Sequence, residues 1–162
     1  MRIESPIRKR IGGGRHLFTV GGIAVALLIG GCASVPMAEK GAELEAKRFE
    51  PVADRAKVYI FRRDRLFAKA VAFDVFLDGR VIASTVSGSF CAVLVLPGEY
   101  VLSSQYYGGA RQLKIDAVAG GVYFVEQIPR GSMTGPFTEL TIADEQGARR
   151  EIIKAGLVKS IF

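Results

Sequence analysis

The sequence predicts a mainly β protein built as a single antiparallel β-sandwich. From Lys57 onward, apolar and polar side chains alternate with period two, which is the pattern of half-buried strands. The apolar runs are short, and each break between them carries Gly or Pro. Short strands that recur about every 8–12 residues, with such turns between them, are typical of two packed sheets.

The apolar runs give the expected strands one by one. They are residues 58–61, 73–77, 81–86, 90–96, 100–102, 112–115, 121–128 and 137–142. Asp78-Gly79 predicts a two-residue hairpin between the second and third of them. The nearly continuous apolar run of residues 90–96 predicts a strand covered on both faces or lying in the core. Pro129–Pro136 predicts a loop.

The last segment of the chain leaves two alternatives open. Residues 144–155 are expected to form a short helix, because their apolar side chains fall on one helical face. Gly156 follows where a C-terminal glycine cap would stand. Gly147 argues against the helix, since a glycine in a helix interior costs about 1 kcal/mol. A β-hairpin through residues 146–147 is therefore the alternative.

The N-terminus has the order of parts of a secretory signal. A leader with five basic side chains precedes an uncharged apolar run, residues 17–29, which is too short to span a bilayer. The run ends in Ile29-Gly30-Gly31-Cys32, which resembles a lipobox, the cleavage and lipidation signal of bacterial lipoproteins. We therefore expect residues 1–31 to be a signal peptide and Cys32 to carry the lipid.

Composition narrows the classes of function. The chain has 22 basic and 16 acidic side chains; removing five and one with the signal leaves 17 and 15, a net charge of +2. This balance does not favour a nucleic-acid partner. The only histidine, His16, lies in the signal, which excludes Ser-His-Asp and Cys-His catalysis and the usual zinc ligand. We expect no enzyme, no metal and no cofactor.

The mature chain is expected to have two parts. Residues 32–56 contain prolines, a glycine and alternating charges, and predict a lipid-anchored tether with at most a turn or two of helix in residues 42–49. Residues 57–162 form the β-sandwich domain. No disulfide can join a lipidated Cys32 to Cys91, so the apolar core must hold the domain together.

Four motifs together carry a resemblance to known proteins: VYIFR from Val58, LDG from Leu77, LPGEY from Leu96 and YFVEQ from Tyr123. With Cys32, their order resembles a family of small bacterial lipoproteins of unknown function. The LDG and PGEY motifs are also similar to PEGA-type and transthyretin-like sandwich repeats. The resemblance implies a fold of the immunoglobulin or transthyretin kind and a location in the envelope, and it implies no catalytic residues.

Candidate binding residues lie in two predicted loops. Arg62, Arg63 and Arg65 form a basic loop after the first strand, where they could meet anionic lipid or polysaccharide phosphate. Tyr106 and Tyr107 stand beside a glycine turn, where exposed rings could stack on sugars or anchor a protein interface. The simpler interpretation of the arginines is a solvated loop without a ligand. The simpler interpretation of the tyrosines is that their rings pack on a sheet.

The other reactive side chains are expected to be structural. Cys91 lies in an apolar run without positive charge nearby, which favours an inert core cysteine over a redox thiol. Asp74, Asp78, Glu99 and Asp116 lie in or beside strands, and nothing in their spacing pairs them for glycoside hydrolysis.

These observations predict a lipid-anchored envelope protein that acts as a non-enzymatic structural or protein-interaction module. The alternative is a module that binds glycan or peptidoglycan, and an envelope hydrolase is a distant third. The membrane is the expected partner through the lipid on Cys32, with an envelope protein or peptidoglycan as the second. In a Gram-negative host, Ala33 in place of an aspartate after Cys32 predicts the outer membrane, facing the periplasm.

Overall fold

The computed structural model describes residues 34–104, 112–133 and 135–161 and confirms the mainly β class with a sandwich of two sheets. The chain divides into residues 1–31 and 32–162, and the description concerns the second unit. Its elements are α1 Lys40–Ala46, β1 Ala56–Phe61, β2 Phe73–Leu77, β3 Arg80–Thr85, β4 Ser89–Val95, β5 Gly98–Ser104, β6 Gln112–Ala117, β7 Val122–Ser132, β8 Gly135–Ile142, α2 Glu145–Lys154 and β9 Gly156–Leu157.

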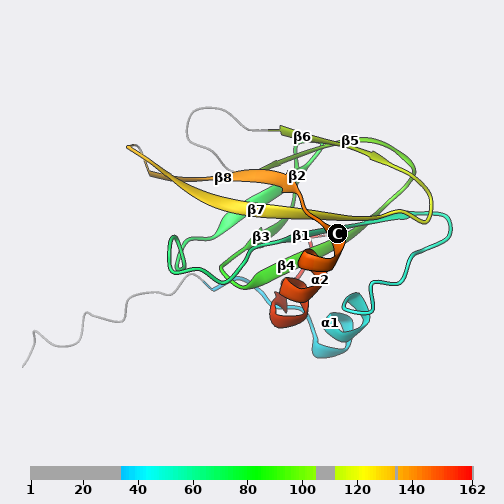
Figure 1. The fold of residues 1–162 in the computed structure, drawn as a ribbon, viewed down its shortest axis with the longest axis horizontal. Coiled ribbons are helices and arrows are strands. Elements are labelled where there is room, and N and C mark those ends of the chain that lie inside the picture. Colours follow the sequence, from blue (N-terminus) through cyan, green and yellow to red (C-terminus); the bar gives the residue numbers. More distant parts are fainter. Residues whose placement is uncertain (1–33, 105–111, 134, 162) are drawn as a thin grey trace, which may run out of the picture. The chain divides into compact units, whose positions relative to one another are not determined.

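The strands form a five-stranded sheet in the order β8-β7-β1-β4-β9 and a four-stranded sheet in the order β3-β2-β5-β6. Both helices lie on the same side of the five-stranded sheet (Figure 1). Most neighbours are antiparallel, as predicted, but β1 pairs with β7 and β4 with β9 in parallel. The sandwich therefore has a third, helical layer on one outer face.

Strand β1 shows why the five-stranded sheet is buried on both faces. Val58 and Ile60 belong to the core between the two sheets, whereas Tyr59 and Phe61 belong to a second core under the helices. Rings of Tyr59 and Phe124 stack at 5.3 Å between centroids in that second core. Because each fully buried large side chain stabilises a fold by about 1.5–3 kcal/mol, both layers contribute to holding the domain.

The segment expected to be a tether is largely part of the folded domain. Phe49 is 4% exposed in the core under the helices, and the Tyr59 hydroxyl donates to the Ala46 carbonyl at 2.6 Å, which fixes the end of α1. Upstream of α1, the Lys159 N–H donates to the Pro36 carbonyl at 2.8 Å. The prediction of a tether over residues 32–56 is therefore wrong from Pro36 onward. A helix this short is marginal alone, and contact with the sheet stabilises it.

The hairpin at Asp78-Gly79 is confirmed. Both residues have positive φ, 47° and 77°, as a type I′ turn requires, and Leu77 pairs with Arg80 across it. The Asp78 carboxylate also accepts the Val101 N–H at 2.8 Å. The turn thus joins β2 to β3 and fastens both to β5.

The C-terminal helix is confirmed over residues 145–154, and the hairpin alternative is wrong. Asp144 is the N-cap, and its carboxylate accepts the Gly147 N–H at 2.7 Å. A Cβ atom at position 147 would lie 2.6 Å from that carboxylate, so Gly147 makes room for the cap and does not weaken a helix interior. The predicted glycine cap is wrong: Gly156 instead opens β9, with its N–H on the Gly88 carbonyl at 3.0 Å.

The loop predicted at residues 129–136 is mostly a β-ribbon. Strands β7 and β8 stay paired to their tip, with Pro129 opposite Thr138 and Pro136 opposite Gly131. Strand β1 ends its pairing with β7 at Glu126, so Pro129 faces no second strand that would need its N–H. Strand β8 is an edge strand, where proline is tolerated for the same reason.

Candidate functional site

Arg62, one of the predicted binding residues, is 1% exposed and not available to a ligand. Its guanidinium donates to the carbonyls of Val71 and Ala68, each at 2.7 Å, and lies 5.0 Å from the centre of the Phe73 ring. Burial lowers the pKa of Arg62 to about 10, so it stays charged at neutral pH. The prediction of an exposed Arg62 is therefore wrong, because its guanidinium is buried against carbonyls of the β1–β2 loop and the Phe73 ring.

The other two arginines of that loop lie around one carboxylate. Arg63 Nε donates to Glu126 Oε1 at 2.9 Å, and Arg65 Nη2 lies 3.8 Å from the same oxygen. The hydrogen bond to Glu126 raises the pKa of Arg63. Tyr106, Tyr107 and Cys32 lie outside the described residues, and their roles stay predictions.

The candidate carboxylates are dispersed except for one pair. Asp74 accepts the Ser84 hydroxyl, and Asp78 is fastened in its turn. Glu99 and Asp116 stand directly opposite each other on β5 and β6, both exposed, a pairing that the sequence analysis missed. Among the described residues, no group of three side chains is placed to hold a metal ion.

Cys91 is fully buried in the core between the sheets, as predicted. Burial raises the pKa of its thiol to about 12. A thiol that stays protonated and has no contact with solvent is not a nucleophile. The inert interpretation of Cys91 is confirmed by its position.

Residues 92–96 are the second half of β4 and the residue after it; in the described part of the chain no strand pairs with them on the side away from β1, and we call them the open edge. Strand β9 covers only the start of β4, and the last backbone bond from that side runs from the Val158 N–H to the Phe90 carbonyl at 2.9 Å. The chain then crosses to the other sheet, where the Ile161 N–H donates to the Ile82 carbonyl at 2.9 Å. Among the described residues, this crossing leaves the rest of β4 without a paired strand on that side.

The backbone of the open edge points outward at alternate residues. The Ser89 carbonyl faces β1, where it accepts the Arg62 N–H, and the Phe90 carbonyl faces β9. By the alternation of a strand, the N–H and C=O of Ala92 and Leu94 also point away from β1. In the described part of the chain, the Ser160 hydroxyl donates a hydrogen bond to the Ala92 carbonyl at 3.5 Å, and the N–H and C=O of Leu94 have no partner.

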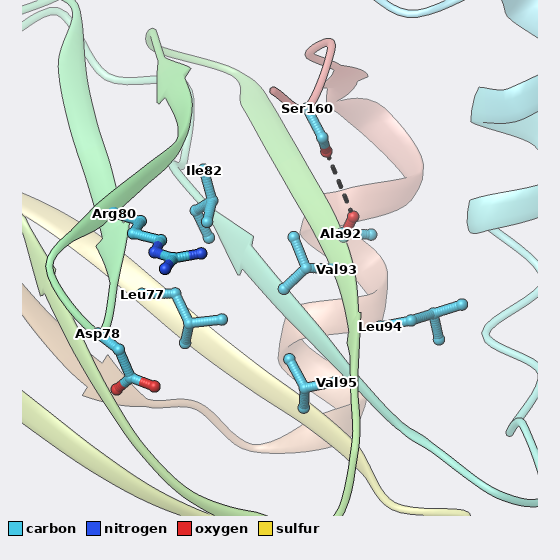
Figure 2. Close-up of a pocket in the computed structure, with 9 residues that line it drawn as sticks. All are labelled: Leu77, Asp78, Arg80, Ile82, Ala92, Val93, Leu94, Val95 and Ser160. Carbon is cyan, nitrogen blue, oxygen red and sulfur yellow. Dashed lines mark hydrogen bonds between the residues drawn. The ribbon is translucent and has the colours of Figure 1, made fainter. Parts of the chain in front are cut away.

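An apolar cleft of about 770 Å³ lies between the open edge and the β2–β3 hairpin. We call it the inner cleft, because it opens into the gap between the two sheets. Figure 2 shows Val93 and Val95 pointing from β4 toward Leu77 and the hairpin, whereas Leu94 points the opposite way. The inner cleft thus receives the inward-facing side chains of the open edge.

A second cleft, of about 460 Å³, lies on the helical side of the same strand. We call it the outer cleft. Ala42 and Ala46 of α1 form one wall, and Ala92 and Leu94 line it from β4. Leu94 is 47% exposed, and the open edge therefore has an apolar hollow on each of its faces.

The rims of the clefts carry more free positive than negative charge. Arg80 lines the inner cleft, and Lys57 and Lys159 line the outer one. Two acids also line them, but Asp78 accepts the Val101 N–H in its turn, and Glu45 lies 3.5 Å from Arg48, two residues beyond the end of α1. Within the described ranges, neither Arg80 nor Lys159 forms an ion pair.

The sequence analysis missed this site. The one signal available was the pair Leu94 and Leu96, which alternate at the end of an apolar run and are 47% and 59% exposed. Which end of the run stays uncovered depends on where the C-terminal chain leaves β4, and no local pattern encodes that.

The fold and the open edge define a small two-sheet sandwich with a helical layer and an incomplete sheet edge. Residues 52–137 match the model of the family described as a protein of unknown function (DUF2846), and the chain belongs to that family. An uncharacterized protein of Haemophilus influenzae is 30% identical over 129 residues, which cover 78% of this chain and 76% of that protein. The family match contains the open edge and both strands of the β2–β3 hairpin.

Proposed function

We propose that the protein is a lipid-anchored module of the bacterial envelope that acts by binding another envelope protein and not by catalysis. The lipobox-like Ile29-Gly30-Gly31-Cys32 supports the anchor. No helix among the described residues has the length and apolarity to cross a bilayer. Ala33 supports the outer membrane of a Gram-negative host as the location.

The open edge of β4 is the observation that carries the binding role. A strand edge with unpaired backbone groups is a template for pairing with another chain, and folded proteins usually protect such edges with charge, proline or a covering segment. Here the edge presents Leu94 and Leu96 to solvent and has apolar clefts on both faces. These features are those of a protein-binding surface.

The short chain between Cys32 and the folded domain indicates where the partner lies. Pro36 is hydrogen bonded to the domain, so Cys32 lies four residues before a fixed point of the fold, with three residues between them. Four extended residues reach about 14 Å. A domain tied this closely stays at the membrane surface, which favours a partner that also lies at that surface.

The two alternatives lack support from the described residues. Glycan binding relied on Tyr106 and Tyr107, which lie outside them, and on a basic loop whose Arg62 is buried. A hydrolase would need paired carboxylates in a cleft, and Glu99 and Asp116 line neither the inner nor the outer cleft.

The anchor is tested by replacing one sulfur atom. In the producing bacterium, Cys32→Ser should abolish labelling with a fatty-acid analogue and leave the uncleaved precursor, because the thiol is the lipid acceptor. Cys91→Ser is the matched control and should be labelled and cleaved like the wild type, because Cys91 is in the core. Normal labelling and cleavage of the Cys32→Ser protein would refute the anchor.

The binding role is tested by photocrosslinking in intact cells. A photoreactive side chain at Leu94 should give one discrete crosslinked product, whereas the same group at the exposed Ile153 of α2 should give none. Identical products from both positions, or no product from Leu94, would contradict the open edge as the binding surface.

A further inference from the structure

We propose that the partner presents an extended segment that adds to the open edge as a β-strand, with side chains that fit apolar clefts on both of its faces and with at least one carboxylate. This proposal rests on the proposed function, whose partner it describes. It commits to main-chain pairing, with side chains entering the inner and outer clefts in turn.

The first argument is the continuity of the sheet. Strand β9 already pairs in parallel with the start of β4, and the Val158 N–H extends that row to the Phe90 carbonyl. Ala92 and Leu94 continue the same row with outward N–H and C=O groups. A segment placed there would prolong the line of β9 and pair with the Ala92 N–H and with the N–H and C=O of Leu94, which have no partner in the described part of the chain, and it would compete with the Ser160 hydroxyl for the Ala92 carbonyl.

The second argument is the spacing of the clefts. Ala92, Val93 and Leu94 line both the inner and the outer cleft, which therefore lie on opposite faces of the same stretch of β4. Successive side chains of a strand point to opposite faces of its sheet. An added strand would place one side chain in the inner cleft and the next in the outer cleft, which is how strand addition obtains specificity.

The third argument is charge. Arg80 at the inner cleft and Lys159 at the outer cleft have no ion-pair partner in the described ranges, whereas the lining acids Asp78 and Glu45 are engaged. Opposite charge across an interface fixes register and excludes wrong partners. The segment therefore carries a carboxylate within reach of one of these cations.

Two other occupants fit the same surface less well. A bilayer could cover Leu94 and Leu96, but hydrocarbon leaves the outward N–H and C=O of Leu94 without partners. A second copy paired edge to edge by two-fold symmetry would bring Arg80 and Lys159 of both copies into one interface, where like charges repel.

The probe for the test is a fluorescent heptapeptide of alternating valine and threonine with glutamate at both ends. Its fluorescence anisotropy is measured against the mature lipoprotein in nanodiscs of phosphatidylcholine. Two N-methylated versions of the peptide are compared. In each version the methyl groups block the amides along one edge of the peptide strand, and the two versions block opposite edges. Only one edge pairs with β4, so one version should lose at least about tenfold in affinity and the other should bind like the parent.

The protein side of the test is Leu94→Pro, with Leu94→Ala as its control. Proline removes the outward N–H of residue 94 without removing a bond to β1, and an edge strand tolerates it. Peptide affinity should fall at least about tenfold further for Leu94→Pro than for Leu94→Ala, and the peptide should slow amide exchange at Ala92 in the wild type. If Leu94→Pro does not fold, the two methylated peptides decide alone.

Several results would overturn the proposal. They are no binding at millimolar peptide, equal binding of both methylated versions, and unchanged affinity of a folded Leu94→Pro protein. Displacement of the peptide by anionic vesicles identifies a membrane surface instead, and concentration-dependent dimers that Leu94→Pro abolishes identify a second copy. Failure of strand addition and failure of the lipid anchor can be told apart, because Cys32→Ser changes the anchor and does not alter the open edge.

Discussion

Glu43 joins α1 to the C-terminal strand, and replacing it tests whether the N-terminal segment belongs to the fold. Its carboxylate accepts hydrogen bonds from Lys40 at 2.7 Å and Lys47 at 2.9 Å, and it accepts the Leu157 N–H at 3.3 Å. These bonds, Lys40 first, lower the pKa of Glu43 from 4.5 to about 2. Glu43→Gln keeps the size of the side chain and one acceptor and removes the charge.

The pKa of Glu43 sets the size of the stability loss in Glu43→Gln and the direction in which that loss changes with pH. A pKa that falls from 4.5 to about 2 on folding corresponds to at most about 3 kcal/mol at neutral pH. Solvent screens part of this, because the Lys40 side chain is 75% exposed, so we expect about 1–2 kcal/mol. Because the folded pKa is the lower one, this stabilisation is complete above pH 4.5 and is lost as pH falls through 2.

Urea unfolding of the unlipidated domain, residues 33–162, measures the prediction at pH 7, 4.5 and 3. Glu43→Gln should unfold at lower urea at pH 7, and its difference from the wild type should shrink at pH 3. Glu45→Gln is the control on the same helix, with a side chain 64% exposed, and should change stability by less than about 0.5 kcal/mol. Equal effects of the two substitutions, or a Glu43→Gln deficit independent of pH, would refute the reasoning.

Two further predictions concern the turn and the core. Gly79→Val should lower the free energy of unfolding by about 1–3 kcal/mol, because a β-branched residue is strained at φ 77°. Asp78→Asn should leave the melting temperature nearly unchanged, because Asn adopts the same turn conformation and its side-chain oxygen still accepts the Val101 N–H. A Gly79→Val protein as stable as the wild type would contradict this account of the turn. Cys91 should react with a thiol reagent only in urea, because burial keeps its pKa at about 12; modification of the folded protein at pH 8 would contradict its place in the core.

Local patterns predicted the elements whose causes are local. The hairpin at Asp78-Gly79 follows from residues that accept positive φ, and the sequence alone specifies it. For α2, the sequence alone places Gly147 in a helix interior, where a glycine argues against the helix. Its place beside the Asp144 carboxylate became visible only with the cap in three dimensions.

Tertiary contacts determine the structure of the segments for which the predictions from sequence are wrong. Residues 36–56 have the composition of a linker, yet a few side chains such as Phe49 and Glu43 find partners on the sheet and on β9. Arg62 looked exposed because three arginines in four residues normally face water. It is buried because the carbonyls of the following loop surround its guanidinium, and a charge-rich sequence does not reveal such a ring of carbonyls.

At the open edge, tertiary contacts also decide the outcome, but here they leave apolar residues exposed that the sequence predicts to be buried. The apolar run of residues 90–96 correctly predicted a strand, but both faces are covered only at its start, where Phe90 and Cys91 lie in the two cores. Farther along, the faces of β4 border clefts because the C-terminal chain crosses to Ile82 and leaves the strand. Apolar residues that would be core in a completed sheet thus stay accessible, and a strand from a partner would restore the burial that their composition predicts.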